Sequence, residues 1–183
     1  RYFIGDVRDK DRIKRACAEV DIIIHAAAMK QITAAEYNPT ECISTNVIGA
    51  ENIISGAIEN NVEKVVAIST DKAVEPSSYM GASKRAAEIY IQNLDIDTKN
   101  TSFITVRFGN VLGSTGSVVS LFQSQIERGG PITVTDKDTT RFFMSVKEAV
   151  ELVLISLTQT MQKDEKGGIS VLNMGQPINI DNL

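Results

Sequence analysis

A hydroxyl, a carboxylate and an amine stand side by side in the segment Thr70-Asp71-Lys72, which follows a short run rich in Val and Ile. Such a run is typical of a buried strand, and the residues after a strand of a parallel sheet lie where ligands bind. The three groups can serve as hydrogen-bond donor, general acid and general base. A polar loop held by a salt bridge is the alternative interpretation of the same residues.

A second candidate pair lies further along the chain, where Lys84 follows Met80 by four residues. This spacing places both side chains on one face of a helix. Tyr79 is five residues before Lys84, so its side chain is turned about 100° away on a helix. We therefore expect Met80 and Lys84, rather than Tyr79, to face the site.

The pattern of the whole chain indicates an α/β protein, because short apolar runs alternate with longer stretches of helical periodicity. We expect a doubly wound parallel sheet of the Rossmann-like kind. The expected strands are 2–4, 20–25, 64–69, 102–107 and 169–173. The expected helices are 9–19, 39–60, 78–94, 117–128 and 146–160. We expect residues 1–110 to form the nucleotide-binding domain and residues 111–183 to form mainly a substrate-binding portion, interleaved with the sheet.

The beginning of the chain lacks the glycine-rich turn of a dinucleotide-binding fold, because no GxGxxG motif precedes Asp6. The glycines of 109–116 have the wrong spacing for that motif, and we interpret this stretch as a substrate loop. We expect the chain to be part of a longer protein that supplies the first strands. Other strand ends are nonetheless suited to a nucleotide: Asp6 and Val7 for an adenine, and the small residues Ala26, Ala27 and Ala28 for close approach of a ligand. A helix N-cap formed by Asp6 or Asp9 is the alternative interpretation of this segment.

Composition excludes several classes of function. With 19 basic and 23 acidic residues and a net charge of -4, the chain offers no broad basic surface for nucleic acid. Cys17 and Cys42 form no disulfide framework and no metal-ligand spacing, so we expect no metal and a reducing, cytoplasmic setting. No apolar run reaches the roughly 20 residues of a membrane span. His25, the single histidine, is assigned a structural role.

The motifs HAAAMK, TNVIGAEN, STDKAV, MGASK, RFGNVLGS and TRFFM occur here in this order. Together they resemble the extended short-chain dehydrogenase/reductases, and specifically the CapD-like UDP-N-acetylglucosamine 4,6-dehydratases of polysaccharide biosynthesis. The resemblance implies a tightly bound NAD and the product UDP-2-acetamido-2,6-dideoxy-hexos-4-ulose, for capsule or O-antigen. It also implies a homo-oligomer, and many relatives carry a membrane-spanning region ahead of the catalytic domain.

The resemblance assigns roles residue by residue. Lys72 matches the base that removes the C5 proton, Asp71 matches the acid that protonates the leaving hydroxyl, and Thr70 matches the hydroxyl of the usual triad. Met80 replaces the usual tyrosine, which implies retention of configuration at C5. The implied cofactor-binding residues are Asp6, Val7, Ala26, Ala27, Ala28, Asn46, Ser69, Lys84 and Phe108. The implied substrate-binding residues are Lys30, Asn110, Ser117, Val118 and Arg141.

Three alternative functions stay open at this stage, and one alternative role for Arg141. A C5-inverting dehydratase or a UDP-sugar 4-epimerase would also use NAD. A non-catalytic NAD-sensing regulatory protein would account for the absence of the tyrosine, with Met80 as core filler. For Arg141, a surface salt bridge with Asp136 or Asp138 competes with binding of the substrate diphosphate.

Overall fold

The structure, a computed structural model, describes residues 1–114, 116–159 and 166–183. The chain divides into two compact units. The first comprises residues 1–107 and 156–171, and the second comprises residues 108–155 and 172–183. The expected helix 146–160 has its last residue outside the described part of the chain. The division between a nucleotide-binding and a substrate-binding portion stays a prediction.

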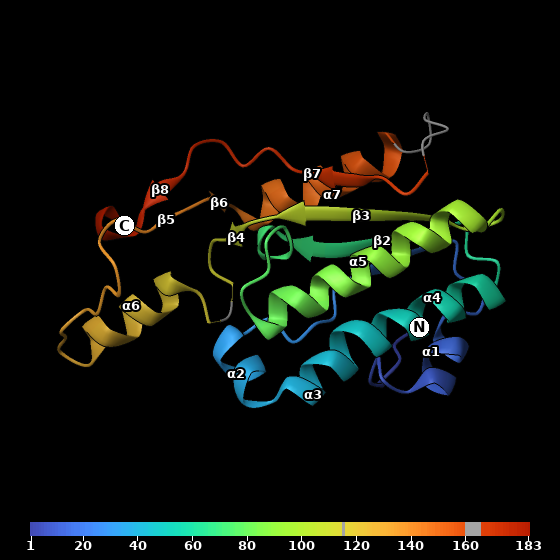
Figure 1. The fold of residues 1–183 in the computed structure, drawn as a ribbon, viewed down its shortest axis with the longest axis horizontal. Helices are drawn as coiled ribbons and strands as arrows, with labels where there is room; N and C mark the ends of the chain where they lie inside the picture. Colours follow the sequence, from blue (N-terminus) through green and yellow to red (C-terminus); the bar gives the residue numbers. More distant parts are fainter. Residues whose placement is uncertain (115, 160–165) are drawn as a thin grey trace. The chain divides into compact units, whose positions relative to one another are not determined.

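The first unit is built on a four-stranded sheet with the order β1-β2-β3-β7. Its strands are β1 (Ile22–His25), β2 (Lys64–Thr70), β3 (Ser102–Phe108) and β7 (Ile169–Val171). β1 pairs parallel with β2, β3 pairs parallel with β7, and the arrows of β2 and β3 point the same way (Figure 1). The expected parallel α/β sheet is confirmed, with strand ends displaced by one or two residues.

The expected strand at residues 2–4 is wrong. These residues have no strand conformation, and Tyr2 and Ile4 are almost fully exposed. A strand exists through hydrogen bonds to a neighbour, and in the described residues β1 has such a neighbour only on its β2 side. Local β propensity is therefore not sufficient to form a strand here.

The helices of the first unit are α1 (Lys10–Ala16), α2 (Ile32–Tyr37), α3 (Pro39–Ile43), η1 (Ser44–Ile48), α4 (Gly49–Glu59), η2 (Asp71–Ala73) and α5 (Tyr79–Asp97). The expected helix 39–60 is present as the consecutive segments α3, η1 and α4. The middle segment is a π-helical turn and carries Asn46. α2 was not expected. Asp9 caps α1 by accepting a hydrogen bond from the Arg12 amide, so the N-cap of this helix is Asp9 rather than Asp6.

The core of the first unit lies between the sheet and the pair α4 and α5, which run beside each other (Figure 1). Ile54 and Ala57 of α4 pack with Val65 of β2, Phe103 of β3 and Ile91 of α5. Burial of these apolar side chains is the main stabilising contribution, at about 25 cal/mol per Å². The packed helices and strands thereby position the loops at the carboxyl ends of β1 and β2.

The second unit contains two small sheets and α6 (Val118–Glu127). β4 (Asn110–Val111) pairs parallel with β6 (Phe143–Met144), and β5 (Thr140–Arg141) pairs antiparallel with β8 (Ile178–Asn179). The chain continues through α7 (Val146–Gln159) and, after β8, ends in η4 (Ile180–Asn182). No helix in the described part of the chain is both long and apolar enough to cross a bilayer.

Candidate active site

Three side-chain groups meet at the carboxyl end of β2. Thr70 Oγ1 donates a hydrogen bond to Asp71 Oδ1 at 2.9 Å, and Lys72 Nζ donates to the same oxygen at 2.9 Å. The Lys72 amide in turn donates to Thr70 Oγ1 at 3.4 Å, which caps the turn η2. The Asp71 and Lys72 side chains are each 32% exposed, so the cluster is open to a ligand. The structure thus brings the three predicted residues together around one carboxylate oxygen.

The charge state of Asp71 follows from two opposing effects. Burial raises the pKa of this carboxyl, but the hydrogen bonds and charge of Lys72, with the hydrogen bond from Thr70, outweigh it and lower the pKa overall. Asp71 is therefore ionised at neutral pH before any substrate arrives. A role as general acid requires that it first receives a proton.

The turn that carries Asp71 and Lys72 rests directly on the beginning of α5. Ser78 caps this helix by accepting a hydrogen bond from the Gly81 amide at 3.1 Å. A Cβ atom at Gly81 would lie 2.5 Å from the Lys72 carbonyl oxygen. Glycine at this position therefore permits the close approach of η2 and α5. This approach positions Asp71 and Lys72, which lie in the turn.

Lys84 reaches from α5 to β2, where its Nζ donates a hydrogen bond to the Ile68 carbonyl at 2.9 Å. Burial lowers the pKa of this amine to about 8, against the opposing charges of Glu88 and Cys42. Its charge in turn adds to the effect of burial on His25, whose pKa is lowered to about 4. His25 is 6% exposed and neutral, in agreement with a structural role.

Met80 is only 4% exposed and packs with Ala35, Cys42 and the partly buried Met29. The structure thus places its thioether in a small apolar cluster, while Tyr79 is half exposed. A direct catalytic role for Met80 stays a prediction. The position four residues before Lys84 therefore carries a buried thioether and no phenol.

Four of the nine predicted cofactor-binding residues lie in the loop after β1 or hold it: Ala26, Ala27, Ala28 and Asn46. Ala26 and Ala27 are exposed and Ala28 is half-buried, so this loop presents backbone without bulky side chains. Asn46 is buried and holds the loop: its Oδ1 accepts from the Met29 amide at 2.8 Å, and its Nδ2 donates to the Met29 carbonyl at 2.9 Å. The amide group of Asn46 therefore positions the loop.

Asp6, Val7 and Lys30 lie on exposed or half-buried loops of the same unit. Asp6 is held by Arg8, and the hydrogen bonds from its side chain and backbone lower the pKa of this carboxyl to about 2. An ionised carboxylate has further acceptor sites, so Asp6 is able to bind an additional donor. The bare backbone of the β1 loop, this carboxylate and the amine of Lys84 fit a dinucleotide.

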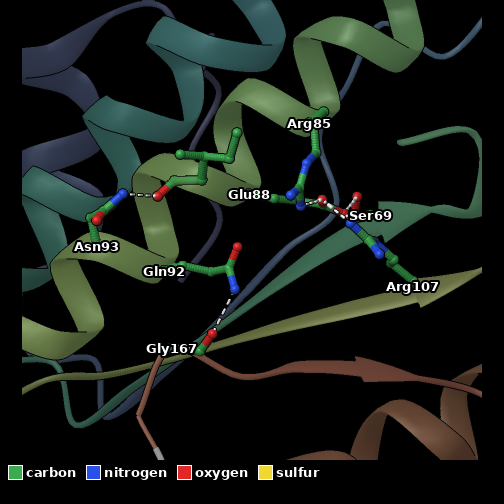
Figure 2. Close-up of polar contacts among 8 residues, drawn as sticks. Ser69, Arg85, Glu88, Gln92, Asn93, Arg107 and Gly167 are labelled. Atoms are coloured by element: carbon green, nitrogen blue, oxygen red, sulfur yellow. Dashed lines mark hydrogen bonds and ion pairs between the residues drawn. The ribbon is translucent and has the colours of Figure 1, made fainter. Parts of the chain in front are cut away.

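A buried ionic network lies directly behind the site and was not found from the sequence. Glu88 of α5 accepts hydrogen bonds from Ser69, Arg85 and Arg107, and Figure 2 shows these side chains converging on its carboxylate. The only signal available in the sequence was the spacing of four residues between Lys84 and Glu88, which places both on one helix face.

The second unit contains a separate cavity of about 350 Å³, a size suited to a small-molecule ligand. Three of the predicted substrate-binding residues line it: Asn110, Val118 and Arg141. Ser117 caps α6 through the Ser120 amide, and Phe108 is half-buried at the end of β3. In the described residues, no ion pair joins Arg141 to Asp136 or Asp138; its Nη1 donates to the Thr140 carbonyl instead.

The chain is a Rossmann-type α/β protein in which a hydroxyl, a carboxylate and an amine meet at the carboxyl end of β2. Residues 1–183 all match the family model described as "Polysaccharide biosynthesis protein", and the chain belongs to this family. The resemblance inferred from the motifs is confirmed.

Named relatives agree with this membership. The chain is 50% identical over 182 residues to the capsular polysaccharide biosynthesis protein CapD of Staphylococcus aureus, covering 98% of this chain and 30% of CapD. It is 48% identical over 157 residues to a UDP-N-acetylglucosamine 4,6-dehydratase (inverting) of Campylobacter jejuni, covering 84% of this chain and 47% of that protein. The chain thus spans less than half the length of these curated relatives.

The fold is also that of a solved structure. Pen from Bacillus thuringiensis is similar with a TM-score of 0.91 and 39% sequence identity, over 100% of this chain and 55% of that one.

Proposed function

We propose that this protein acts as an NAD-dependent nucleotide-sugar 4,6-dehydratase on UDP-N-acetylglucosamine in polysaccharide biosynthesis. The observation that carries the proposal is the shared Asp71 Oδ1, which accepts hydrogen bonds from both Thr70 and Lys72 at the ligand end of a parallel strand. An acid, a base and a hydroxyl in contact are what an elimination of water requires. The name of the Campylobacter jejuni relative supports the same reaction class, and the name of CapD supports a role in polysaccharide biosynthesis.

NAD, when bound, takes the hydride from C4 of the sugar and returns it to C6. In this chain, Asp6 and Val7 would hold the adenine, the loop Ala26–Ala28 would contact the cofactor through its backbone, and Lys84 would hydrogen-bond the nicotinamide ribose. The positive charge of Lys84 favours departure of the hydride from the sugar. Arg141, Asn110 and the beginning of α6 would bind the UDP group in the second unit.

The proton accounting begins with the ionised Asp71. Oxidation at C4 releases the hydroxyl proton, which Thr70 accepts while passing its own proton to Asp71 along their 2.9 Å hydrogen bond. Asp71 becomes the neutral acid that the next step needs. Loss of its negative charge also lowers the proton affinity of Lys72, so the amine releases a proton to solvent and becomes a base.

Elimination then uses both groups. Neutral Lys72 takes the proton from C5, Asp71 gives its proton to the C6 hydroxyl, and water leaves. When the hydride returns to C6, the Lys72 ammonium gives a proton back to C5. The sugar has lost one water, the methyl group has formed, and Asp71 is ionised again. Lys72 then takes back from solvent the proton that it released, which restores the starting ion pair. No tyrosine is required in this route, which agrees with Met80 at that position.

We propose that the C5 configuration is retained, on the basis of Met80 and of a single group, Lys72, that both removes and returns the proton. The inverting C5 outcome is the second candidate, favoured by the name of the Campylobacter jejuni relative.

Proton NMR of UDP-N-acetylglucosamine with the full-length protein and NAD in deuterated buffer tests the function. A new C6 methyl signal with deuterium and unchanged configuration at C5 is expected. An inverted C5 identifies the second candidate, and a C4 epimer without a methyl signal identifies an epimerase. No turnover despite binding of NAD and the UDP-sugar identifies a sensing protein.

A further inference from the structure

Among the described residues of the first unit, Glu88 is the most deeply buried acid, with a side chain that is 1% exposed. Its Oε1 accepts from Ser69 Oγ at 2.6 Å and from Arg107 Nε at 2.7 Å. Its Oε2 accepts from Arg107 Nη2 and, at 3.0 Å, from Arg85 Nη1. A buried carboxylate needs such partners, because an unpaired charge in the interior is strongly unfavourable.

These partners come from the elements that build the active site. Ser69 comes from β2, Arg107 from the end of β3 and Glu88 from α5 (Figure 2). In the sequence, Ser69 immediately precedes Thr70, and Glu88 follows Lys84 by one helical turn. The bidentate pair with Arg107 adds a fixed geometry to this connection. One carboxylate thus joins two strand ends to the helix that carries Lys84.

We propose that Glu88 is a positioning residue for the proposed dehydration: through Ser69 and Arg107 it holds the end of β2, with its acid–base pair, in place against Lys84. The inference rests on the proposed function. Glu88 is closed off from any ligand, so it acts through these residues and not on the sugar.

Glu88 also supplies the negative charge nearest to Lys84 on its own helix. The other titratable groups around this amine are His25 of β1, which is neutral, and Cys42 of α3. Replacing Glu88 by a neutral residue removes this negative charge. The loss disfavours the protonated form of Lys84 and moves its titration to lower pH.

Glu88→Gln in the full-length protein tests the role, with Asp97→Asn as the control. Asp97 is an exposed acid on the same helix, so its variant loses the same charge away from the network. We expect Glu88→Gln to lower kcat by about tenfold to a hundredfold with KM changed by less than about threefold, as for a misplaced catalytic group. The alkaline limb of the pH–rate profile should move to lower pH.

Glu88→Asp is the conservative variant, because it keeps the charge but shortens the side chain. We expect it to lower kcat while leaving the alkaline limb at the wild-type pH. If Glu88→Gln does not fold, kcat of folded Glu88→Asp decides: a loss supports the role and a wild-type value overturns it. A Glu88→Gln variant that folds and matches Asp97→Asn in kcat and pH profile, or that loses only stability, also overturns the proposal.

A readout independent of turnover separates this proposal from the proposed function. The ¹³Cε resonance of Lys84, assigned by its loss in Lys84→Arg, reports the titration of the amine directly. If the wild-type protein does not dehydrate the sugar, the proposed function fails. In that case a lower titration midpoint of Lys84 in Glu88→Gln still supports the connection between Glu88 and Lys84, and an unchanged midpoint overturns it.

Discussion

Replacing Gly81 by alanine tests whether the close contact between α5 and the turn η2 sets the catalytic geometry. The added Cβ would lie 2.5 Å from the Lys72 carbonyl oxygen and 3.3 Å from Pro76 Cβ. Real Cβ atoms essentially never approach another heavy atom closer than 3.0 Å. The Lys72 carbonyl oxygen must therefore move away by at least 0.5 Å, the difference between 3.0 Å and 2.5 Å. The atom in the way is backbone, so a side-chain rotation does not relieve the contact.

The magnitude follows from two opposing contributions to stability and one to rate. Alanine in a helix gains about 1 kcal/mol over glycine, while overpacking costs about 1–3 kcal/mol. We therefore expect a loss of about 0–2 kcal/mol in the free energy of unfolding, the difference of those ranges. Since a displacement of about 1 Å costs about a hundredfold in rate, a displacement of half that size should lower kcat about tenfold.

The assay is the formation of the C6 methyl signal, measured alongside urea unfolding of the same protein. Gly56→Ala is the matched control, because it makes the same substitution in α4, where the nearest atom is the side-chain sulfur of Cys17 at 3.2 Å. This variant should keep the wild-type kcat. If Gly81→Ala also keeps the wild-type kcat while folded, the argument that this contact positions Asp71 and Lys72 is refuted.

Three further predictions concern the Asp71–Lys72 pair itself, the cavity of the second unit and the buried histidine. Asp71→Asn and Lys72→Ala should each lower kcat by about 10²–10⁴-fold while calorimetry shows unchanged UDP binding, and unchanged turnover would remove the pair from the mechanism. Arg141→Gln should raise KM for the UDP-sugar about tenfold or more through loss of charge-assisted hydrogen bonds, and an unaltered KM would contradict its role. Burial and the charge of Lys84 lower the pKa of His25 from its ordinary value of 6.5 to about 4 in the folded protein, so the unfolded chain takes up the proton first as the pH falls. As pH falls from about 6.5 to 4, up to about 3 kcal/mol of stability should therefore be lost in urea unfolding, and His25→Gln should reduce this dependence.

Features that depend on neighbours along the chain could be predicted from the amino-acid sequence alone. Thr70, Asp71 and Lys72 are adjacent, and Lys84 is recognisable by its spacing of four from Met80, because backbone geometry alone brings such residues together. The alternation of apolar runs and helical periods likewise indicated the parallel α/β sheet, since each period reflects the geometry of one element.

Features that depend on residues distant in sequence became visible only in the folded chain. Ser69 and Arg107 each lie 19 residues from Glu88, so only the packing of β2 and β3 on α5 creates the network behind the site. Met80 is buried because α2 and α3 supply Ala35 and Cys42 around it. The segment 2–4 has strand-like residues but forms no strand, because no described strand of the chain pairs with it. Burial, charge pairing and strand formation are set by three-dimensional neighbours, and these do not follow from local spacing.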